Sequence, residues 1–192
     1  MSRSPEFSNS KEELFIPALG GFYNKFAQPV GWVIFRAVLG GMLMIEGWPK
    51  ISDPMAQVGF VESLGFWPGA FWSPFLAALQ FVGGAMLIVG LLTRPIALAL
   101  AVMLLITLWF HMANPYPAPL LTEAGIAALK ATPELFTPDA QGMLQDGGAG
   151  AMHMVQMKAE FASLFWAGGV ALFAAFGGGY FSIDRWLLRK QV

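Results

Sequence analysis

Long apolar runs with very few charges dominate the hydropathy pattern of this chain. Four of them approach the roughly 20 residues that an α-helix needs to cross a bilayer. They occupy residues 30–49, 71–92, 95–113 and 159–181. Because a chain in lipid must satisfy its backbone hydrogen bonds within each segment, every run is predicted to be helical. The pattern predicts an all-α membrane protein, a four-transmembrane-helix antiparallel bundle forming a single domain over 29–188.

The connections between these runs carry different patterns. The turn "LLTRP" is tight, and Pro95 is suited to the first turn of a helix. In the first connection, Asp53–Pro54 resembles an N-cap followed by a first-turn proline. Apolar residues then recur at helical spacing, at Met55, Val58, Val61 and Leu64. This pattern predicts a short interfacial helix in the 1–2 loop.

The connection 114–157 is long for a loop, and long loops usually have a function or are disordered. Two of its stretches, "EAGIAALKA" and "PDAQGMLQ", each favour a short helix. We interpret the loop as an outer lid or a docking surface for other subunits.

The two ends of the chain are predicted to be tails, 1–28 and 189–192. The first lacks the basic, apolar and small-residue regions of a signal peptide. Ser10, followed by Glu12 and Glu13, is a candidate start for a short helix. Its scattered Phe and Leu residues favour a position along the membrane surface.

Basic residues flank the runs unequally. Seven fall on one side of the predicted bundle, namely Arg3, Lys11, Lys25, Arg94, Arg185, Arg189 and Lys190. Three fall on the other side, namely Lys50, Lys130 and Lys158. The positive-inside rule then predicts that both termini are cytoplasmic.

Composition agrees with a membrane location and removes several function classes. Charged residues make up 12% of the 192 residues, about half of what soluble domains carry. The net charge of −1 comes with scattered Lys and Arg, so no nucleic-acid partner is expected. The chain has no cysteine, which excludes disulfides, thiol redox pairs and Cys-ligated metal centres. Electrons for any redox role must therefore come from a bound cofactor or a partner.

Polar residues within the runs are the candidates for chemistry. Lipid penalises such groups, so they are expected to face the bundle interior. Most of them fall in the outer half, which predicts a shared pocket there. The proton-handling candidates are Glu46, His111 and Glu160. The candidates for contact with a quinone or a similar small apolar ligand are Arg36, Gln80, Lys50, Trp48 and Trp109. No metal site is predicted.

Structural interpretations remain open beside these functional ones. Glu46 and Lys50, spaced i,i+4 with the acid first, are also typical of a pair reaching for the headgroups. Glu160, close to Lys158, is also ordinary at a helix start, and His111 is equally suited to the interface. Arg36 and Gln80 sit inside their runs, and interhelical hydrogen bonding alone would explain them.

Four segments together resemble the DoxX family of small four-helix bacterial membrane proteins. They read "FRAVLGG", "GWPK", "QFVGGAMLIVGLLTR" and "GGGYFSIDRWL". The resemblance implies the bacterial inner membrane and a redox context, because a relative is the membrane subunit of a thiosulfate:quinone oxidoreductase. Two features depart from the family pattern: Gln80 replaces an acid of the second helix, and the 3–4 loop is longer.

We therefore expect an integral membrane accessory subunit of DoxX type. It would be redox-associated, contact quinone, and dock into a larger complex through the N-terminal tail and the 114–157 loop. It has no independent catalytic motif, so any enzymatic role would be as part of a quinone-linked oxidoreductase. The alternative is a non-catalytic assembly subunit without a small-molecule site. A small-solute transporter is a weaker alternative, because no pair of interrupted helices forms a midplane site.

Overall fold

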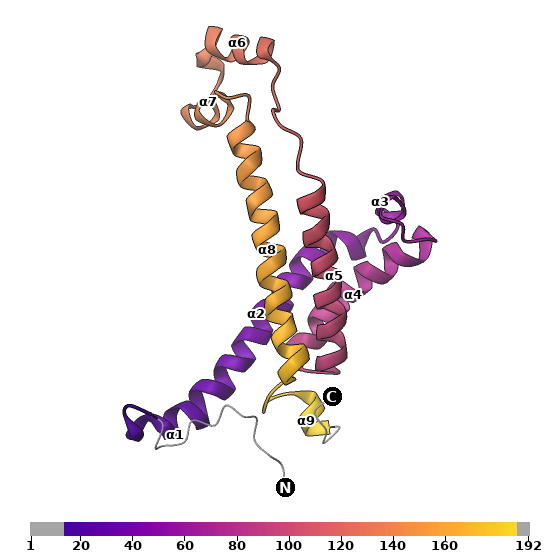
Figure 1. The fold of residues 1–192 in the computed structure, drawn as a ribbon, viewed down its shortest axis with the longest axis vertical. Helices are drawn as coiled ribbons and strands as arrows, with labels where there is room; N and C mark the ends of the chain where they lie inside the picture. The colour runs from indigo at the N-terminus through magenta and orange to yellow at the C-terminus, as the bar shows by residue number, and fades with distance from the viewer. Residues whose placement is uncertain (1–13, 188–192) are drawn as a thin grey trace. The chain divides into compact units, whose positions relative to one another are not determined.

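The computed structural model describes residues 14–187. The helix start expected at Ser10 and the tail 189–192 lie outside the described residues. Within 14–187, four helices are long and apolar enough to cross a membrane, and no strand occurs (Figure 1). The candidate spans are Pro17–Ser52, Gly69–Val89, Thr93–Ala113 and Ala149–Phe176. The predicted all-α membrane class is confirmed.

The chain forms two compact units. One comprises the described residues up to Met103 and those from Ala167 onward, and the other is Leu104–Trp166. Helices α5 (Thr93–Ala113) and α8 (Ala149–Phe176) each contribute residues to both.

The first unit is built on close packing between α2 (Gln28–Ser52) and α4 (Gly69–Val89). Glycines make the approach possible. A Cβ added at Gly40 would come within 2.5 Å of the Gly84 carbonyl oxygen, and one at Gly84 within 2.8 Å of the Gly40 oxygen. Because only hydrogen fits between these backbones, the glycines set the distance between the helices.

Helical backbone also precedes α2. It consists of η1 (Pro17–Leu19), α1 (Gly20–Phe22) and η2, a π-helix over Tyr23–Ala27. With α2 these short pieces form the continuous candidate span Pro17–Ser52.

The predicted helix between the first two spans is present as α3 (Val58–Ser63), but it begins later than predicted. Asp53 does not cap α3; it is the C-cap residue of α2, and residues 54–57 form a turn. The turn is held in place because Ser73 Oγ donates to the Pro54 carbonyl at 2.6 Å. The real α3 is therefore shorter than the apolar spacing suggested, and Val61 is its buried anchor.

A tight turn joins α4 to α5. Gly90 has a φ of +71°, and its N–H donates to Leu87 while the Leu91 N–H donates to Met86. This is a Schellman arrangement, in which a left-handed residue ends the helix. Helix α5 then begins at Thr93 with Pro95 in its first turn, where a missing N–H costs no hydrogen bond.

The second unit contains the two short helices expected in the long connection. They are α6 (Glu123–Ala131) and α7 (Pro138–Leu144), with the 3₁₀ turn η3 (Pro133–Leu135) between them. Threonines cap both: Thr122 Oγ1 accepts from the Gly125 N–H, and Thr137 Oγ1 from the Ala140 N–H. Helix α8 begins at Ala149, well before residue 159, because Asp146 caps its first turn.

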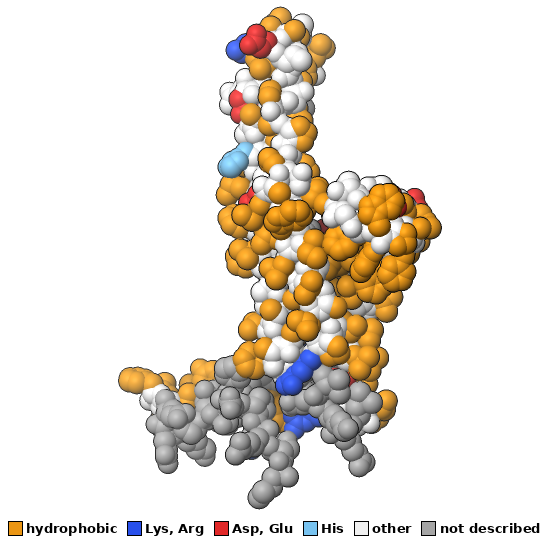
Figure 2. Space-filling model, turned by 45° about the vertical axis from the view of Figure 1, so that its right-hand side comes forward, with side chains coloured by type: hydrophobic (Ala, Val, Ile, Leu, Met, Phe, Trp, Pro, Cys, Tyr) orange, Lys and Arg blue, Asp and Glu red, His pale blue; other side chains and the backbone are white. Residues whose placement is uncertain are grey.

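Apolar side chains cover the outer surfaces of the long helices (Figure 2). Ile45, Leu98, Leu105 and Phe165, for example, are all more than half exposed. In water such a surface would be unfavourable, whereas acyl chains accept it at no cost. The described protein is therefore embedded in the lipid bilayer through these helices.

Candidate functional site

A buried arginine lies at the centre of the first polar cluster. Arg36 is only 2% exposed. Its Nη1 donates to the Gly178 carbonyl and its Nη2 to the Phe181 carbonyl at 2.7 Å. The carboxylate of Asp184 also acts favourably on the Arg36 charge. The guanidinium therefore ties α2 to the segment that follows α8.

That segment can wrap around the guanidinium because it contains three successive glycines. Gly177 and Gly179 both have a φ of +78°, which side chains with a Cβ rarely adopt. A Cβ on Gly178 would come within 3.0 Å of Arg36 Nη1. The Gly177 carbonyl accepts from Trp32 Nε1 at 2.9 Å, which adds a second link to α2.

Asp184 connects this segment to the start of α5. It lies in α9 (Ile183–Leu187) and is 1% exposed. Its Oδ1 accepts from the Leu92 N–H at 2.6 Å, and its Oδ2 from the Thr93 N–H and Oγ1 at 2.8 and 2.7 Å. The first N–H groups of a helix lack intrahelical partners and favour a negative charge. Asp184 thus caps α5 from a distant part of the sequence.

We call Arg36, Thr93 and Asp184, with the carbonyls of Gly178 and Phe181, the Asp184 cluster. The three polar side chains of the cluster, those of Arg36, Thr93 and Asp184, are all buried. The described donors and acceptors of the cluster are nearly all used, although the buried Arg36 Nε has no hydrogen-bond partner. Such saturation by backbone groups is typical of a structural clamp.

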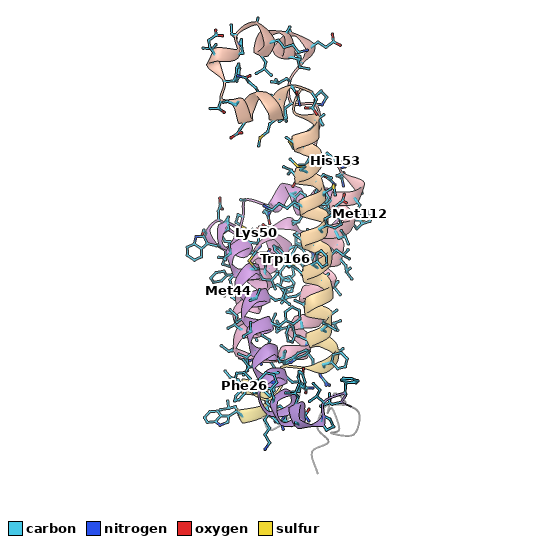
Figure 3. All side chains as sticks on the ribbon, turned by 90° about the vertical axis from the view of Figure 1, so that its left-hand side faces the viewer. Phe26, Met44, Lys50, Met112, His153 and Trp166 are labelled. Atoms are coloured by element: carbon cyan, nitrogen blue, oxygen red, sulfur yellow. The ribbon has the colours of Figure 1, made fainter. Side chains whose placement is uncertain are left out.

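A second polar contact joins α2 to α4. Lys50 Nζ donates to Gln80 Oε1 at 2.7 Å. Gln80 is buried and Lys50 is half-buried. Glu46 precedes Lys50 by one turn, and its charge acts favourably on the amine. We call Lys50 and Gln80 the Lys50 pair; Figure 3 labels Phe26, Met44 and Lys50 in succession along the helical run that leads to it.

Glu46 does not face the interior as predicted; its side chain is exposed. The buried stripe of α2 is Arg36, Leu39, Gly40, Leu43 and Gly47. At about 100° per residue, Glu46 falls roughly 80° from the direction of Arg36, at the margin of that stripe. The carboxylate therefore lies beside the Lys50 pair on the outside of the α2–α4 contact.

The second unit brings Glu160 near the end of α5 through Gln156. Gln156 Nε2 donates to Glu160 Oε1 at 2.6 Å and to the backbone carbonyl of His111. Its Oε1 accepts from the Tyr116 N–H at 3.1 Å. The imidazole of His111 lies against the Tyr116 ring, with centroids 5.9 Å apart. His111 and Glu160 thus share Gln156 as a neighbour, although Gln156 contacts the main chain of His111.

The two candidate tryptophans have exposed rings. Trp48 is 61% exposed and lies 5.7 Å from the Phe81 ring, between α2 and α4. Trp109, on α5, is 59% exposed. Of these two, Trp48 is one turn or less from both Glu46 and Lys50. Among residues 14–187, no three His, Asp or Glu side chains gather closely enough to hold a metal ion.

Sequence reasoning missed three residues of these sites: Thr93, Asp184 and Gln156. Two of them did carry a signal. Thr93 lies in the turn "LLTRP" and Asp184 in the segment "GGGYFSIDRWL", but neither pattern by itself indicates a contact with the buried arginine. A threonine at the start of one helix and a carboxylate shortly after the end of another are typical of a helix N-terminus that is capped by a residue distant in sequence. Gln156 lies in a stretch without a motif, and no sequence signal singled it out.

The four apolar helices and their buried polar contacts define a multi-pass α-helical membrane protein. The DoxX family model matches residues 31–113. Inner membrane protein YqjF of Escherichia coli (strain K12) is 31% identical over 90 residues, which is 47% of this chain and 68% of that protein. The chain therefore belongs to the DoxX family, as the resemblance predicted, and is a multi-pass inner membrane protein. No solved structure matches the chain.

Proposed function

We propose that this protein is an accessory subunit of a redox-linked membrane complex and contacts a quinone beside the Lys50 pair. The observation that carries the proposal is the 2.7 Å contact between Lys50 Nζ and Gln80 Oε1. It places an amine with three N–H donors at a junction of two membrane helices. A quinone headgroup presents carbonyl oxygens that accept such hydrogen bonds.

The neighbours of the pair suit the same ligand. Glu46 is exposed one turn away, where a carboxylate can exchange protons with a bound headgroup. Trp48 and Phe81 supply aromatic surface against which a planar ring can pack. Reduction of a quinone to a quinol takes two electrons and two protons. This chain would contribute the proton-handling side chain, and a redox centre of the partner subunit would contribute the electrons.

The accessory assignment rests on the absence of cysteine from the chain and on the segment between α5 and α8. The segment exposes apolar side chains, including Leu135 in η3 and Met143 in α7, which are more than half exposed. This segment and the N-terminal tail are our candidate docking surfaces for other subunits.

Binding of decylubiquinone to the purified full-length protein tests the quinone site. We expect the quinone to quench tryptophan fluorescence saturably and to raise the thermal midpoint of unfolding. Lys50→Met should weaken this binding roughly tenfold, because one charged hydrogen bond contributes about 1.5 kcal/mol or more. Lys25→Met removes the same type of side chain from the same helical run and should leave binding unchanged. Equal affinity for both variants would contradict the proposal.

A non-catalytic assembly subunit is the second candidate, and the Asp184 cluster favours it. Its buried charges are engaged with backbone groups and with one another, which is what a rigid scaffold requires. Glu46→Gln distinguishes the two functions. The quinone proposal predicts lost redox activity of the complex with assembly intact on native gels. The assembly proposal predicts unchanged activity, or loss of assembly.

We also propose that both termini are cytoplasmic, in accordance with the distribution of Lys and Arg. The absence of native cysteine makes this directly measurable, since a single introduced thiol has no background. A membrane-impermeant maleimide should label Lys130→Cys in intact spheroplasts and Lys25→Cys only after lysis. The reverse pattern would invert the topology.

A further inference from the structure

Two arginines flank the hydrogen bonds that join α9 to α5. Arg94 follows Thr93, and Arg185 follows Asp184. The Asp184 carboxylate is already engaged, because its two oxygens accept from the main chain of Leu92 and from Thr93. Asp184 also offsets the buried charge of Arg36. Among the described residues, Asp184 is thus engaged with Thr93, Leu92 and Arg36, and the guanidiniums of Arg94 and Arg185 have other neighbours.

Both outer guanidiniums are held in place. Arg94 packs against Gly177, since a Cβ there would lie 3.3 Å from Arg94 Nε. Within residues 14–187, that Nε is buried without a hydrogen-bond partner. The Arg185 guanidinium lies over the Tyr180 ring at 3.8 Å from its centroid, a cation–π contact that fixes its plane. Each guanidinium carries a positive charge and a planar set of donors that suit an anionic partner.

Exposed aromatic side chains surround the same place. Phe181 is 67% and Trp186 is 82% exposed, and Tyr180 is nearly half exposed. All three lie in the segment after the span that ends at Phe176, Trp186 within α9. Aromatic rings of this kind collect at the level of the lipid headgroups. A site at this level favours the phosphate of a lipid headgroup over an anion free in solution.

We propose that Arg94 and Arg185 bind the phosphate of an anionic phospholipid at the membrane surface where α5 begins. The planar guanidinium donates two parallel hydrogen bonds to phosphate oxygens, which an ammonium cannot do. The acyl chains then lie against the apolar faces of the long helices, and the aromatic rings of α9 and the preceding loop sit beside the headgroup.

Lipid retention by the full-length protein tests this site. The protein is reconstituted in nanodiscs containing equal parts of phosphatidylglycerol and phosphatidylcholine, extracted in mild detergent, and examined by native mass spectrometry. Wild type should retain phosphatidylglycerol preferentially. Each arginine near a membrane surface contributes roughly a fivefold preference, so the Arg94→Gln, Arg185→Gln double variant should lose most of it.

Lys130→Gln is the matched control, because it removes one basic charge from α6 and should not change lipid preference. Replacing both arginines with lysine keeps the positive charges but removes the paired hydrogen bonds of the guanidinium. This variant should retain only part of the preference for phosphatidylglycerol. If the double variant does not fold by circular dichroism, Arg185→Gln alone carries the test, because its side chain lies over Tyr180 outside the Asp184 hydrogen bonds.

Two outcomes would overturn the proposal. One is a folded variant that retains phosphatidylglycerol as strongly as wild type does. The other is inorganic phosphate raising the thermal midpoint of the wild type as much as phosphatidylglycerol does, which would identify a site for a free anion. Stabilisation by phosphatidylglycerol alone, lost in the glutamine variants, supports the lipid site.

Discussion

The Asp184 cluster and the Lys50 pair hold polar side chains on the same helix in different ways. Arg36 and Lys50 are separated along α2 by roughly 20 Å, at 1.5 Å per residue. Arg36 is buried, and two of its nitrogens donate to main-chain carbonyls. Lys50 is half-buried and donates to a side-chain amide beside an exposed carboxylate.

The difference separates structural polar groups from those that can serve a ligand. A buried charge bonded to backbone cannot change partner without moving the chain, so it stabilises one arrangement. A half-buried amine bonded to a neutral amide can exchange that partner for a ligand at small cost. Mutations at the two sites should therefore have different consequences. Those in the Asp184 cluster should lower the free energy of unfolding, and those in the Lys50 pair should weaken ligand binding.

The largest expected effect is that of Arg36→Ala. It leaves Asp184 buried without its compensating charge and leaves the carbonyls of Gly178 and Phe181 without their donor. Removing one partner of a buried charged network costs roughly 3–5 kcal/mol. Thermal unfolding in detergent, followed by circular dichroism, measures the loss.

Lys25→Ala, which removes an exposed charge from the same helical run, should shift the midpoint little. Equal thermal midpoints for Arg36→Ala and wild type would contradict the comparison, because the Asp184 cluster would then contribute no more stability than the Lys50 pair.

Gly84→Ala should have the next largest effect, since it forces α2 and α4 apart between the two sites. The new Cβ would meet the Gly40 carbonyl at 2.8 Å and the Met44 Cγ at 3.1 Å. Overpacking of this kind costs about 1–3 kcal/mol. The same thermal unfolding assay applies.

Gly41→Ala is the matched control. A Cβ at Gly41 meets nothing within 4 Å, and alanine in place of glycine within a helix favours the helix by up to about 1 kcal/mol. Gly84→Ala should therefore lower the free energy of unfolding, and Gly41→Ala should leave it unchanged or raise it. A loss of stability at Gly41 would mean that helix packing at these glycines is not what sets the cost.

Gln80→Leu should have a smaller effect on stability. It removes the acceptor of Lys50, but that amine is half-buried and retains Glu46 one turn away. We expect a cost of about 0.5–1.5 kcal/mol, the usual net contribution of one hydrogen bond. The variant should fold normally and bind decylubiquinone differently from wild type. A loss as large as that of Arg36→Ala would make the Lys50 pair a second structural clamp.

The smallest expected effect on stability is that of Asp146, which precedes α8 and caps its first turn. The Gly150 N–H, and then the Gly148 N–H, lower the pKa of this exposed carboxyl below its ordinary value of 3.8. The charged form is therefore stabilised in the folded protein. This contribution is present above pH 3.8 and is lost as the pH falls through the lower folded value.

Hydrogen exchange at the amides of Gly148 and Gly150 measures the effect. At neutral pH, Asp146→Asn should speed exchange at both amides, whereas below the folded pKa the variant and wild type should converge. A constant difference between them down to the lowest pH would show that charge does not matter at this cap.

Much of the fold could be predicted because lipid imposes a simple rule on sequence. The four apolar runs had to be helices, and α6 and α7 followed from their local pattern. The predicted start of α3 was wrong. The capping signal at Asp53–Pro54 coincides with the end of α2, which extends to Ser52. Capping residues are short signals, and the packing of neighbouring helices decides between them.

The candidate polar residues were identifiable for the same reason: a charge in an apolar run is conspicuous. Their partners were not. Arg36 is engaged with the main chain of residues 178 and 181, and carbonyl groups leave no mark in a sequence. Likewise, the angle that leaves Glu46 exposed depends on which face of α2 meets α4.

The sequence by itself determined that this chain enters a membrane as helices, because apolar length and backbone hydrogen bonding leave no other solution in lipid. Only the tertiary structure decided which polar groups meet: Asp184 reaches Thr93 across much of the chain, and Lys50 reaches Gln80 on another helix. Helix formation depends on neighbours along the chain, whereas these contacts depend on where glycines allow two backbones to approach.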